Sequence, residues 1–233
     1  DVQEKLKTIK TKLEKFQKGV LEKFDKYIVG IALLPPPKAE DEKQSADKDK
    51  INVLVLVDDS DSRKMSKYEL KDKLTAIINS IAQEIDKNLV PQAIILSELW
   101  QNCYDGKYEL LQLIALSAPI FDRGMLAAIK IAEVHKTMVL KKFEKYIVSY
   151  VLAGSLVQGK ATPTSDIDVW IVIDDTDVKK MTRAELKDKL RAIIIGMGLE
   201  AGDLTGIKNK LNIQVYILTD FWDSLREANP IIF

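Results

Sequence analysis

The sequence has very few of the residues that build disulfide frameworks or zinc sites. It contains one cysteine, Cys103, and one histidine, His135, among 233 residues. A disulfide within the chain and a cysteine-rich zinc site are therefore excluded. No apolar run is long enough to span a bilayer, and no secretory signal peptide is recognisable. These absences predict a cytoplasmic protein, in a compartment where thiols stay reduced.

A net charge is also missing. Lys plus Arg and Asp plus Glu both number 35, so the formal net charge is zero. The sequence therefore gives no global cationic field of the kind that holds RNA or DNA unselectively, although a local basic patch stays open as an alternative. The chain is 46% hydrophobic, which is enough for packed cores. Its length allows one large domain or two domains of about 100–150 residues.

Three segments occur twice, in the same order. The matching pairs are 23–29 with 142–148, 58–74 with 174–190, and 92–100 with 214–222. The second pair is identical at eleven of seventeen positions, and the numbering offset is 116 (174 − 58) there and 122 (222 − 100) in the third pair. We interpret the pattern as a tandem duplication, with domains over 1–125 and 126–233. Because the second repeat has no counterpart of 116–133, we expect it to be truncated at its C-terminus.

Both repeats predict the same order of helices and strands. An amphipathic helix with apolar residues at helical spacing comes first, followed by two strands, a helix, a third strand and a Trp-led helix. In the second repeat these segments are a helix over 124–143 and strands over 146–153, 167–173 and 211–218. In the first repeat they are a helix over 2–24 and strands over 27–34, 51–57 and 93–96. Strands separated by helices predict the α/β (α+β) class, with a small mixed sheet in each domain.

Glycine, serine and two aspartates of the second repeat form a chemically suggestive pattern. Leu152-Ala-Gly-Ser155 is followed, after ten residues, by Asp166-Ile-Asp168 at the start of a strand. Residues i and i+2 of a strand share a face, so two carboxylates lie close together and repel. A divalent cation such as Mg²⁺ removes this conflict. Gly154 allows close approach to a phosphate, and a helix beginning at Ser155 would direct free N–H groups at it.

This pattern resembles the signature of the DNA polymerase beta superfamily of nucleotidyltransferases, in particular its minimal members. The resemblance implies transfer of an NMP from an NTP, with ATP the expected donor, to an acceptor hydroxyl of a protein, an RNA or a small molecule. It implies that Asp166 and Asp168 are the catalytic residues and bind Mg²⁺ or Mn²⁺. The residues expected to contact the nucleotide are Gly154, Ser155, Lys160 and Ser165.

The pattern departs from the family in two ways. The family has a third carboxylate on the later strand, and the expected position falls at Gln214 or Asn212, neither of which is charged. This favours an alternative, a catalytically weakened nucleotide-binding or protein-interaction module. In the first repeat, Pro35-Pro36 replaces Gly-Ser, and Lys50 and Asn52 replace the aspartates. Proline offers no N–H to a phosphate, so the first repeat is interpreted as a degenerate pseudo-domain.

A few other residues receive structural or minor roles from the sequence. His135 lies in a Lys-rich helix and is predicted at the surface. Trp222 matches a tryptophan of the first repeat, which favours core packing over base stacking. Trp170 follows Asp168 by two positions, so it is expected to line the same face.

Two acid pairs, at 58–59 and 174–175, occur in both repeats, including the one without the aspartate motif. They are therefore interpreted as turn formers. Asp203 and Asp220 are the acids nearest to the third strand, and the sequence gives neither of them a place in the site. Ser66 and Thr182 each precede a glutamate by three residues, which predicts capping boxes at two helix starts.

Overall fold

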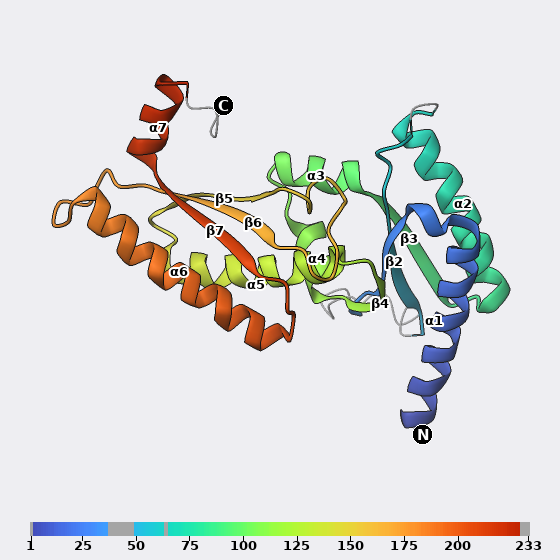
Figure 1. Cartoon of the computed structure of the whole chain (residues 1–233). Helices are drawn as coiled ribbons and strands as arrows, with labels where there is room; N and C mark the ends of the chain where they lie inside the picture. The colour runs from blue at the N-terminus through green and yellow to red at the C-terminus, as the bar shows by residue number, and fades with distance from the viewer. Residues whose placement is uncertain (1, 37–48, 63–64, 229–233) are drawn as a thin grey trace, which may run out of the picture. The chain divides into compact units, whose positions relative to one another are not determined.

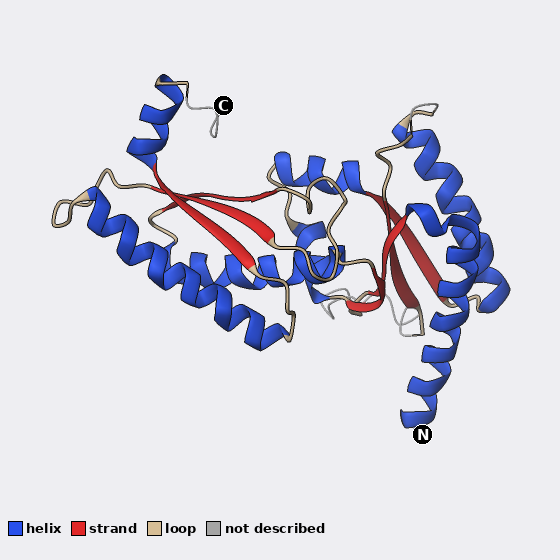
Figure 2. Cartoon of the chain, viewed as in Figure 1, coloured by secondary structure: helices blue, strands red, loops and turns tan. Residues whose placement is uncertain are grey.

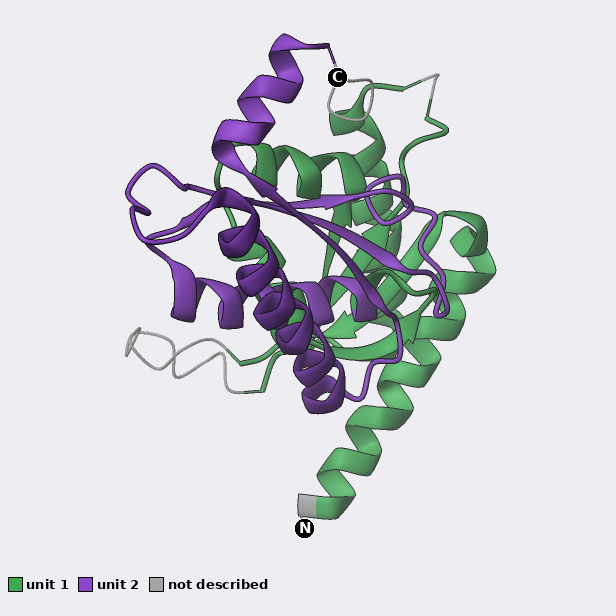
Figure 3. Ribbon diagram, turned by 60° about the vertical axis from the view of Figure 1, so that its left-hand side comes forward, with its two compact units in different colours: residues 1–126 green, residues 127–233 purple. Residues whose placement is uncertain are grey.

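The computed structural model of the chain describes residues 2–36, 49–62 and 65–228 (Figure 1). The chain divides into two compact units, residues 1–126 (unit 1) and 127–233 (unit 2), shown separately coloured in Figure 3. Both contain helices and strands in alternation (Figure 2). Among the described residues, no helix is both long and apolar enough to cross a membrane.

Unit 1 holds the first eight elements, which are α1 (Val2–Phe24), β1 (Ile28–Leu33), β2 (Ile51–Val57), α2 (Lys67–Ile85), β3 (Leu89–Ile95), α3 (Leu96–Tyr104), α4 (Glu109–Leu116) and β4 (Ala118–Asp122). A short 3₁₀ turn, Asp25–Tyr27, joins α1 to β1. Helix α5 (Met125–Phe143) begins in unit 1 and continues in unit 2. The remaining elements are β5 (Ile147–Ala153), β6 (Ile167–Ile173), α6 (Arg183–Thr205), β7 (Leu211–Ile217) and α7 (Leu218–Arg226).

Each unit has one small mixed sheet, so the predicted fold class is confirmed. The strand orders are β3-β2-β1-β4 and β5-β6-β7. In both sheets the first strand is antiparallel to the second, and the second is parallel to the third. The extra strand β4 pairs antiparallel with β1. The sequence patterns did not predict α4 or β4, and they placed the third strand of unit 1 at 93–96 only.

The parallel strand pairs of the two units have the same register. Asn52 lies opposite Val90 in unit 1, and Asp168 lies opposite Asn212 in unit 2. These residues differ in number by 116 (168 − 52) and 122 (212 − 90), which are the offsets of the matching sequence segments. Sequence matching and strand pairing therefore relate the same positions of the two units to one another.

The sheet of unit 1 is buried on both faces. One face packs against α1 and α2, where Phe16, Val55 and Ile78 belong to the same core cluster. On the opposite face Leu54 is fully buried as well. The side chain of Leu126, in the first turn of α5, lies so close to Gly30 that an added Cβ there would be 2.7 Å away. Unit 1 thus has no solvent-exposed sheet face along β2.

The sheet of unit 2 is buried on one face and partly exposed on the other, where Val172 is buried near the end of β6. Along β6, Ile167, Val169 and Ile171 are buried, whereas Asp168 and Trp170, which point the other way, are partly exposed. Helices α5 and α6 lie on the buried side (Figure 1). We call the other side, which carries Asp168 and Trp170, the open face.

His135 lies in the core of unit 2, so its predicted surface position is wrong. It is fully buried. Its Nδ1 lies 2.7 Å from the Tyr150 hydroxyl on β5, and its Nε2 lies 2.9 Å from the carbonyl oxygen of Ile194 on α6. With the proton on Nε2, both ring nitrogens are satisfied without a charge. Burial lowers the pKa of His135, which favours this neutral form.

Candidate active site

Gly154 directly follows β5 and adopts a left-handed conformation, with φ +71°. A Cβ atom at this position would overlap Oδ2 of Asp168. Two reasons therefore favour glycine at position 154: other residues rarely adopt this φ, and no side chain fits beside the Asp168 carboxylate. The backbone of the Gly-Ser turn and the Asp168 carboxylate consequently form one compact group.

Asp168 lies on the central strand β6, opposite Ala153 of β5 and Asn212 of β7. The side-chain amide of Asn212 donates a hydrogen bond of 2.9 Å to Oδ1 of Asp168. Asp166 precedes β6 by one residue and is exposed, whereas Asp168 is half-buried. Of the two positions considered for a third acid, the structure thus brings Asn212 to Asp168, whereas Gln214 lies opposite Trp170.

The segment after Gly154 forms turns and not the helix that was considered for Ser155. The backbone N–H of Lys160 donates to the Ser155 carbonyl at 2.8 Å, and that of Gly159 donates to the Leu156 carbonyl at 3.1 Å. Ser155 is half-buried, and Lys160 is exposed. No helix terminus is therefore available here to bind an anion, and only single groups of the turn remain for a phosphate.

Ser165 belongs to a second turn, which approaches the start of β6. Its Oγ accepts a hydrogen bond of 2.9 Å from the Thr162 N–H and lies 2.8 Å from the Thr162 hydroxyl. The buried side chain of Asn209 donates to the carbonyl oxygens of Thr162 and Ser165, at 3.1 and 2.9 Å. The Ser165 hydroxyl is thus bonded within the loop, and Asn209, which the sequence analysis missed, holds this loop in place.

The donor set suits a magnesium-type cation that is completed by its substrate. Asp166 and Asp168 supply carboxylate oxygens, and Mg²⁺ is usually held by one or two carboxylates plus substrate phosphates. Within the part of the chain that the structure describes, no group of three or more His, Cys, Asp or Glu side chains could hold a metal. Asp220 is bonded to Arg183, at 3.4 Å, beyond the far end of β7, and Asp203 is exposed on α6.

Aromatic side chains extend over the open face of unit 2. The ring centroids of Trp170 and Tyr216 are 5.9 Å apart, and those of Tyr216 and Phe221 are 6.3 Å apart. Trp222 follows on α7, with its ring 6.2 Å from Phe221. Trp222 is 59% exposed, so its predicted core packing is wrong. Trp170 lies on the face of Asp168, as the period of the strand predicts.

The first members of the two acid pairs form turns. Asp174 accepts hydrogen bonds from the hydroxyl and N–H of Thr176, at 2.7 and 3.0 Å, and these two contacts, the hydroxyl first, lower the pKa of Asp174. Asp58 accepts from the Ser60 N–H at 3.0 Å in unit 1. Both aspartates have the turn-forming role that was predicted.

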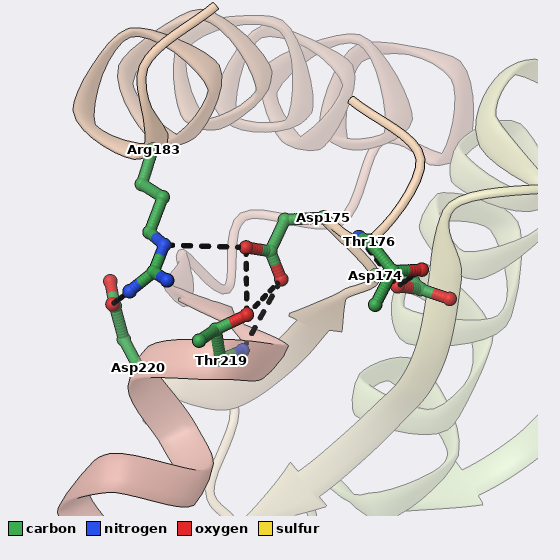
Figure 4. A network of polar contacts seen from close by, with 6 residues as sticks. All are labelled: Asp174, Asp175, Thr176, Arg183, Thr219 and Asp220. Carbon is green, nitrogen blue, oxygen red and sulfur yellow. Dashed lines mark hydrogen bonds and ion pairs between the residues drawn. The ribbon is translucent and has the colours of Figure 1, made fainter. Parts of the chain in front are cut away.

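The second members of the pairs also hold helix starts (Figure 4). Asp175 accepts hydrogen bonds from the N–H and hydroxyl of Thr219 in the first turn of α7, at 3.2 and 2.8 Å. Arg183 of α6 lies 3.6 Å from Asp175 and 3.4 Å from Asp220.

In unit 1, Asp59 binds the start of α3 in the same way. Asp59 and Asp175 also begin turns, because their carbonyl oxygens accept from the N–H groups of Ser62 and Val178, at 3.1 and 3.2 Å. The long-range contacts of their side chains are a second role, which the sequence did not predict.

The turn at Gly154, the carboxylates of Asp166 and Asp168, and the sheet with one partly exposed face all belong to unit 2. Residues 133–211 match the family model of the nucleotidyltransferase domain. The match supports a nucleotidyltransferase domain in unit 2 and, with it, nucleotidyl transfer as the general function. The matched residues run from α5 to the start of β7 and include Gly154, Asp166 and Asp168. No curated protein and no solved structure matches the chain.

Proposed function

We propose that this protein is a cation-dependent nucleotidyltransferase that moves an NMP from an NTP, with ATP the donor, to an acceptor hydroxyl and releases pyrophosphate. The observation that carries the proposal is the packing of the Asp168 carboxylate against Gly154, beside Asp166. Because the Gly-Ser backbone and the Asp168 carboxylate lie so close together, one bound triphosphate could contact the backbone and a cation held by the carboxylates at the same time. The single cysteine supports the cytoplasmic setting that we propose with it.

Each site residue has a specific task in the proposed reaction. Asp166 and Asp168 would hold Mg²⁺ or Mn²⁺, which when bound supplies positive charge to the phosphates of the NTP. The turn at Gly154 and Ser155 binds the triphosphate, and the exposed ammonium of Lys160 neutralises part of its charge. The hydrogen bond from Asn212 fixes the orientation of the Asp168 carboxylate.

The acceptor hydroxyl must lose a proton during transfer. Asn212 cannot take it, because an amide is not a base at neutral pH. Asp168 is hydrogen-bonded to Asn212, so we propose that the exposed Asp166 accepts the proton, through the carboxylate oxygen that does not hold the cation. With only two carboxylates, we expect a slower enzyme than one with three.

Residues 1–125 are proposed to be a degenerate copy of the domain over 126–233. Lys50 and Asn52 stand at the positions of the aspartates, and Pro35 follows β1 where Gly154 follows β5. A lysine repels a cation, and a proline offers no N–H. The buried Leu54 also leaves no room for a substrate on that face of β2. We propose that unit 1 has no catalytic role.

A second candidate function follows from Asn212. A domain that lost its third acid would keep the fold and a nucleotide site, and would act as a nucleotide-binding or protein-interaction module. The hydrogen bond from Asn212 to Asp168 supports this alternative, because Asn212 is one of the two positions at which the resemblance predicts a third carboxylate.

One experiment separates the two functions. The wild type, Asp168→Ala and Asn212→Asp are incubated with Mg²⁺ or Mn²⁺ and α-labelled NTPs, and label on protein, RNA and small-molecule acceptors is counted. Transfer by the wild type that Asp168→Ala abolishes supports the enzyme. Transfer that appears only in Asn212→Asp supports the weakened module. Equal transfer by the wild type and Asp168→Ala would overturn both readings of the site.

A further inference from the structure

The open face of unit 2 is arranged in rows that cross its three strands. The first row contains Ala153, Asp168 and Asn212. The next row, two residues along each strand, contains Val151, Trp170 and Gln214. Two residues of a strand span about 7 Å. The Trp170 ring and the Gln214 amide therefore lie one row away from Asp168. This separation is similar to the distance between the 5′-phosphate and the base of a nucleotide.

Trp170 offers a flat apolar surface in this second row. Trp170 is partly exposed, and its ring meets that of Tyr216 edge-on, at 5.9 Å between centroids and 64° between planes. Val151, on the other side of Trp170, is 40% exposed. The contact with Tyr216 holds the indole in place, and the exposed part of Trp170 can meet a stacking partner.

Gln214 can distinguish one base from another by hydrogen bonding, which stacking on a ring does not do. Its neighbours Ile213 and Val215 are buried on the helix side, whereas Gln214 is exposed on the open face, opposite Trp170. Its amide makes no hydrogen bond to any residue in the described part of the chain. A glutamine amide has one acceptor and one donor group side by side, which pair with N6 and N7 of adenine. Guanine presents two acceptors there and makes a poorer match.

We infer that Trp170 and Gln214 form the site for the adenine base of the donor nucleotide, with Trp170 stacking on the ring and Gln214 reading its N6–N7 edge. The inference rests on the proposed function, because the triphosphate must be held at Gly154 and Asp168 for the base to reach this row. Unit 1 has Leu54 and Gln92 at the corresponding positions of the same register, and there Leu54 is fully buried and stacks on no base.

The test is calorimetric titration of the whole chain with three probes in Mg²⁺, namely ATP, GTP and inorganic tripolyphosphate. The variants are Trp170→Leu, which introduces the leucine found in unit 1, Trp170→Phe, which keeps a ring, and Gln214→Leu. Trp222→Leu is the control, because it removes an exposed ring of the same aromatic series farther from Asp168. Thermal unfolding checks that each variant is folded. If Trp170→Leu does not fold, the test relies on Trp170→Phe and Gln214→Leu.

We expect ATP to bind about tenfold more weakly to Trp170→Leu, as loss of one base stack predicts, with tripolyphosphate unchanged. Trp170→Phe should retain most of the affinity, and Gln214→Leu should abolish the preference for ATP over GTP. Equal binding of ATP, GTP and tripolyphosphate to the wild type would overturn the base site alone. Failure of the wild type to bind any of the three would overturn the proposed function together with it.

Discussion

Unit 1 and unit 2 pair their strands in the same register, yet they use one face of the sheet differently. In unit 2 this face carries Asp168 and Trp170, which are partly exposed. In unit 1 the corresponding residues are Asn52 and Leu54, and Leu54 is fully buried. In unit 1 the first turn of α5, with Leu126, lies against this face, whereas in unit 2 the described residues leave Asp168 and Trp170 partly exposed.

Polar contacts that both units retain are explained by folding. Asp59 and Asp175 both hold the start of the helix after the third strand, and unit 1 keeps this contact although it lacks the aspartate motif. Residues that differ between the units, such as Asp168 and Trp170, are better candidates for function. The comparison therefore separates structural polar residues from functional ones within a single chain.

The largest effect is expected from Asp168→Asn, which introduces the residue of unit 1. Nucleotide transfer should fall about a hundredfold or more, because charge stabilisation by a bound cation contributes several kcal/mol. The measurement is the rate of label transfer from an α-labelled NTP. Asp203→Asn, on the exposed surface of α6, makes the same charge change and should leave the rate unaltered. Equal losses in both variants would contradict the assignment of Asp168.

Gly154→Ala should lower both stability and transfer. The left-handed φ costs about 1–2 kcal/mol for a residue with a side chain, and the new Cβ would displace Asp168. Gly106→Ala is the matched control, since Gly106 has φ +72° and no atom within 4 Å of an added Cβ. Urea unfolding and transfer rates of the two variants isolate the effect on Asp168. If Gly154→Ala were fully active, the Gly-Ser turn would have no role at the site.

His135→Phe should change how stability depends on pH. Phe16 occupies the corresponding core position in unit 1. Because burial lowers the pKa of His135, the unfolded chain takes up a proton at a pH where the folded chain does not. Stability is then complete above about pH 6.5, the pKa of an unfolded histidine, and decreases as the pH falls below it.

The wild type is therefore expected to lose stability between pH 7 and pH 5. In His135→Phe this contribution should be absent, whatever the absolute stability of the variant. Denaturant unfolding at several pH values measures both chains. The same pH slope in both would show that His135 is not the titrating group.

The smallest effects are expected from Asp59→Ala and Asp175→Ala. Each removes a carboxylate that accepts a backbone N–H at a helix start, which contributes about 1 kcal/mol. Similar losses of unfolding free energy in the two units would support their common scaffold role. A loss of nucleotide transfer in Asp175→Ala without a loss of stability would instead place Asp175 in the chemistry.

Much of the fold could be predicted from the sequence. The strands at 51–57 and 167–173 were predicted with their observed bounds, because continuous apolar runs between turn signals are strong local patterns. Strand β3 was predicted too short, since Pro91 interrupts its pattern. Proline is tolerated there because β3 is an edge strand. Helix α4 and strand β4 were missed, as the second repeat offered no counterpart to compare.

Local sequence patterns were sufficient to predict the repeated order of elements, the fold class, and a glycine and two aspartates at a suggestive spacing. They did not reveal that Asn212 and not Gln214 reaches Asp168, that His135 is buried, or that one face of the second sheet is partly exposed; these follow from the folded chain. The physical reason is that local patterns depend on neighbours along the chain. Register between parallel strands and coverage of a sheet face depend instead on segments far apart in sequence, here β6, β7 and the helices beside them.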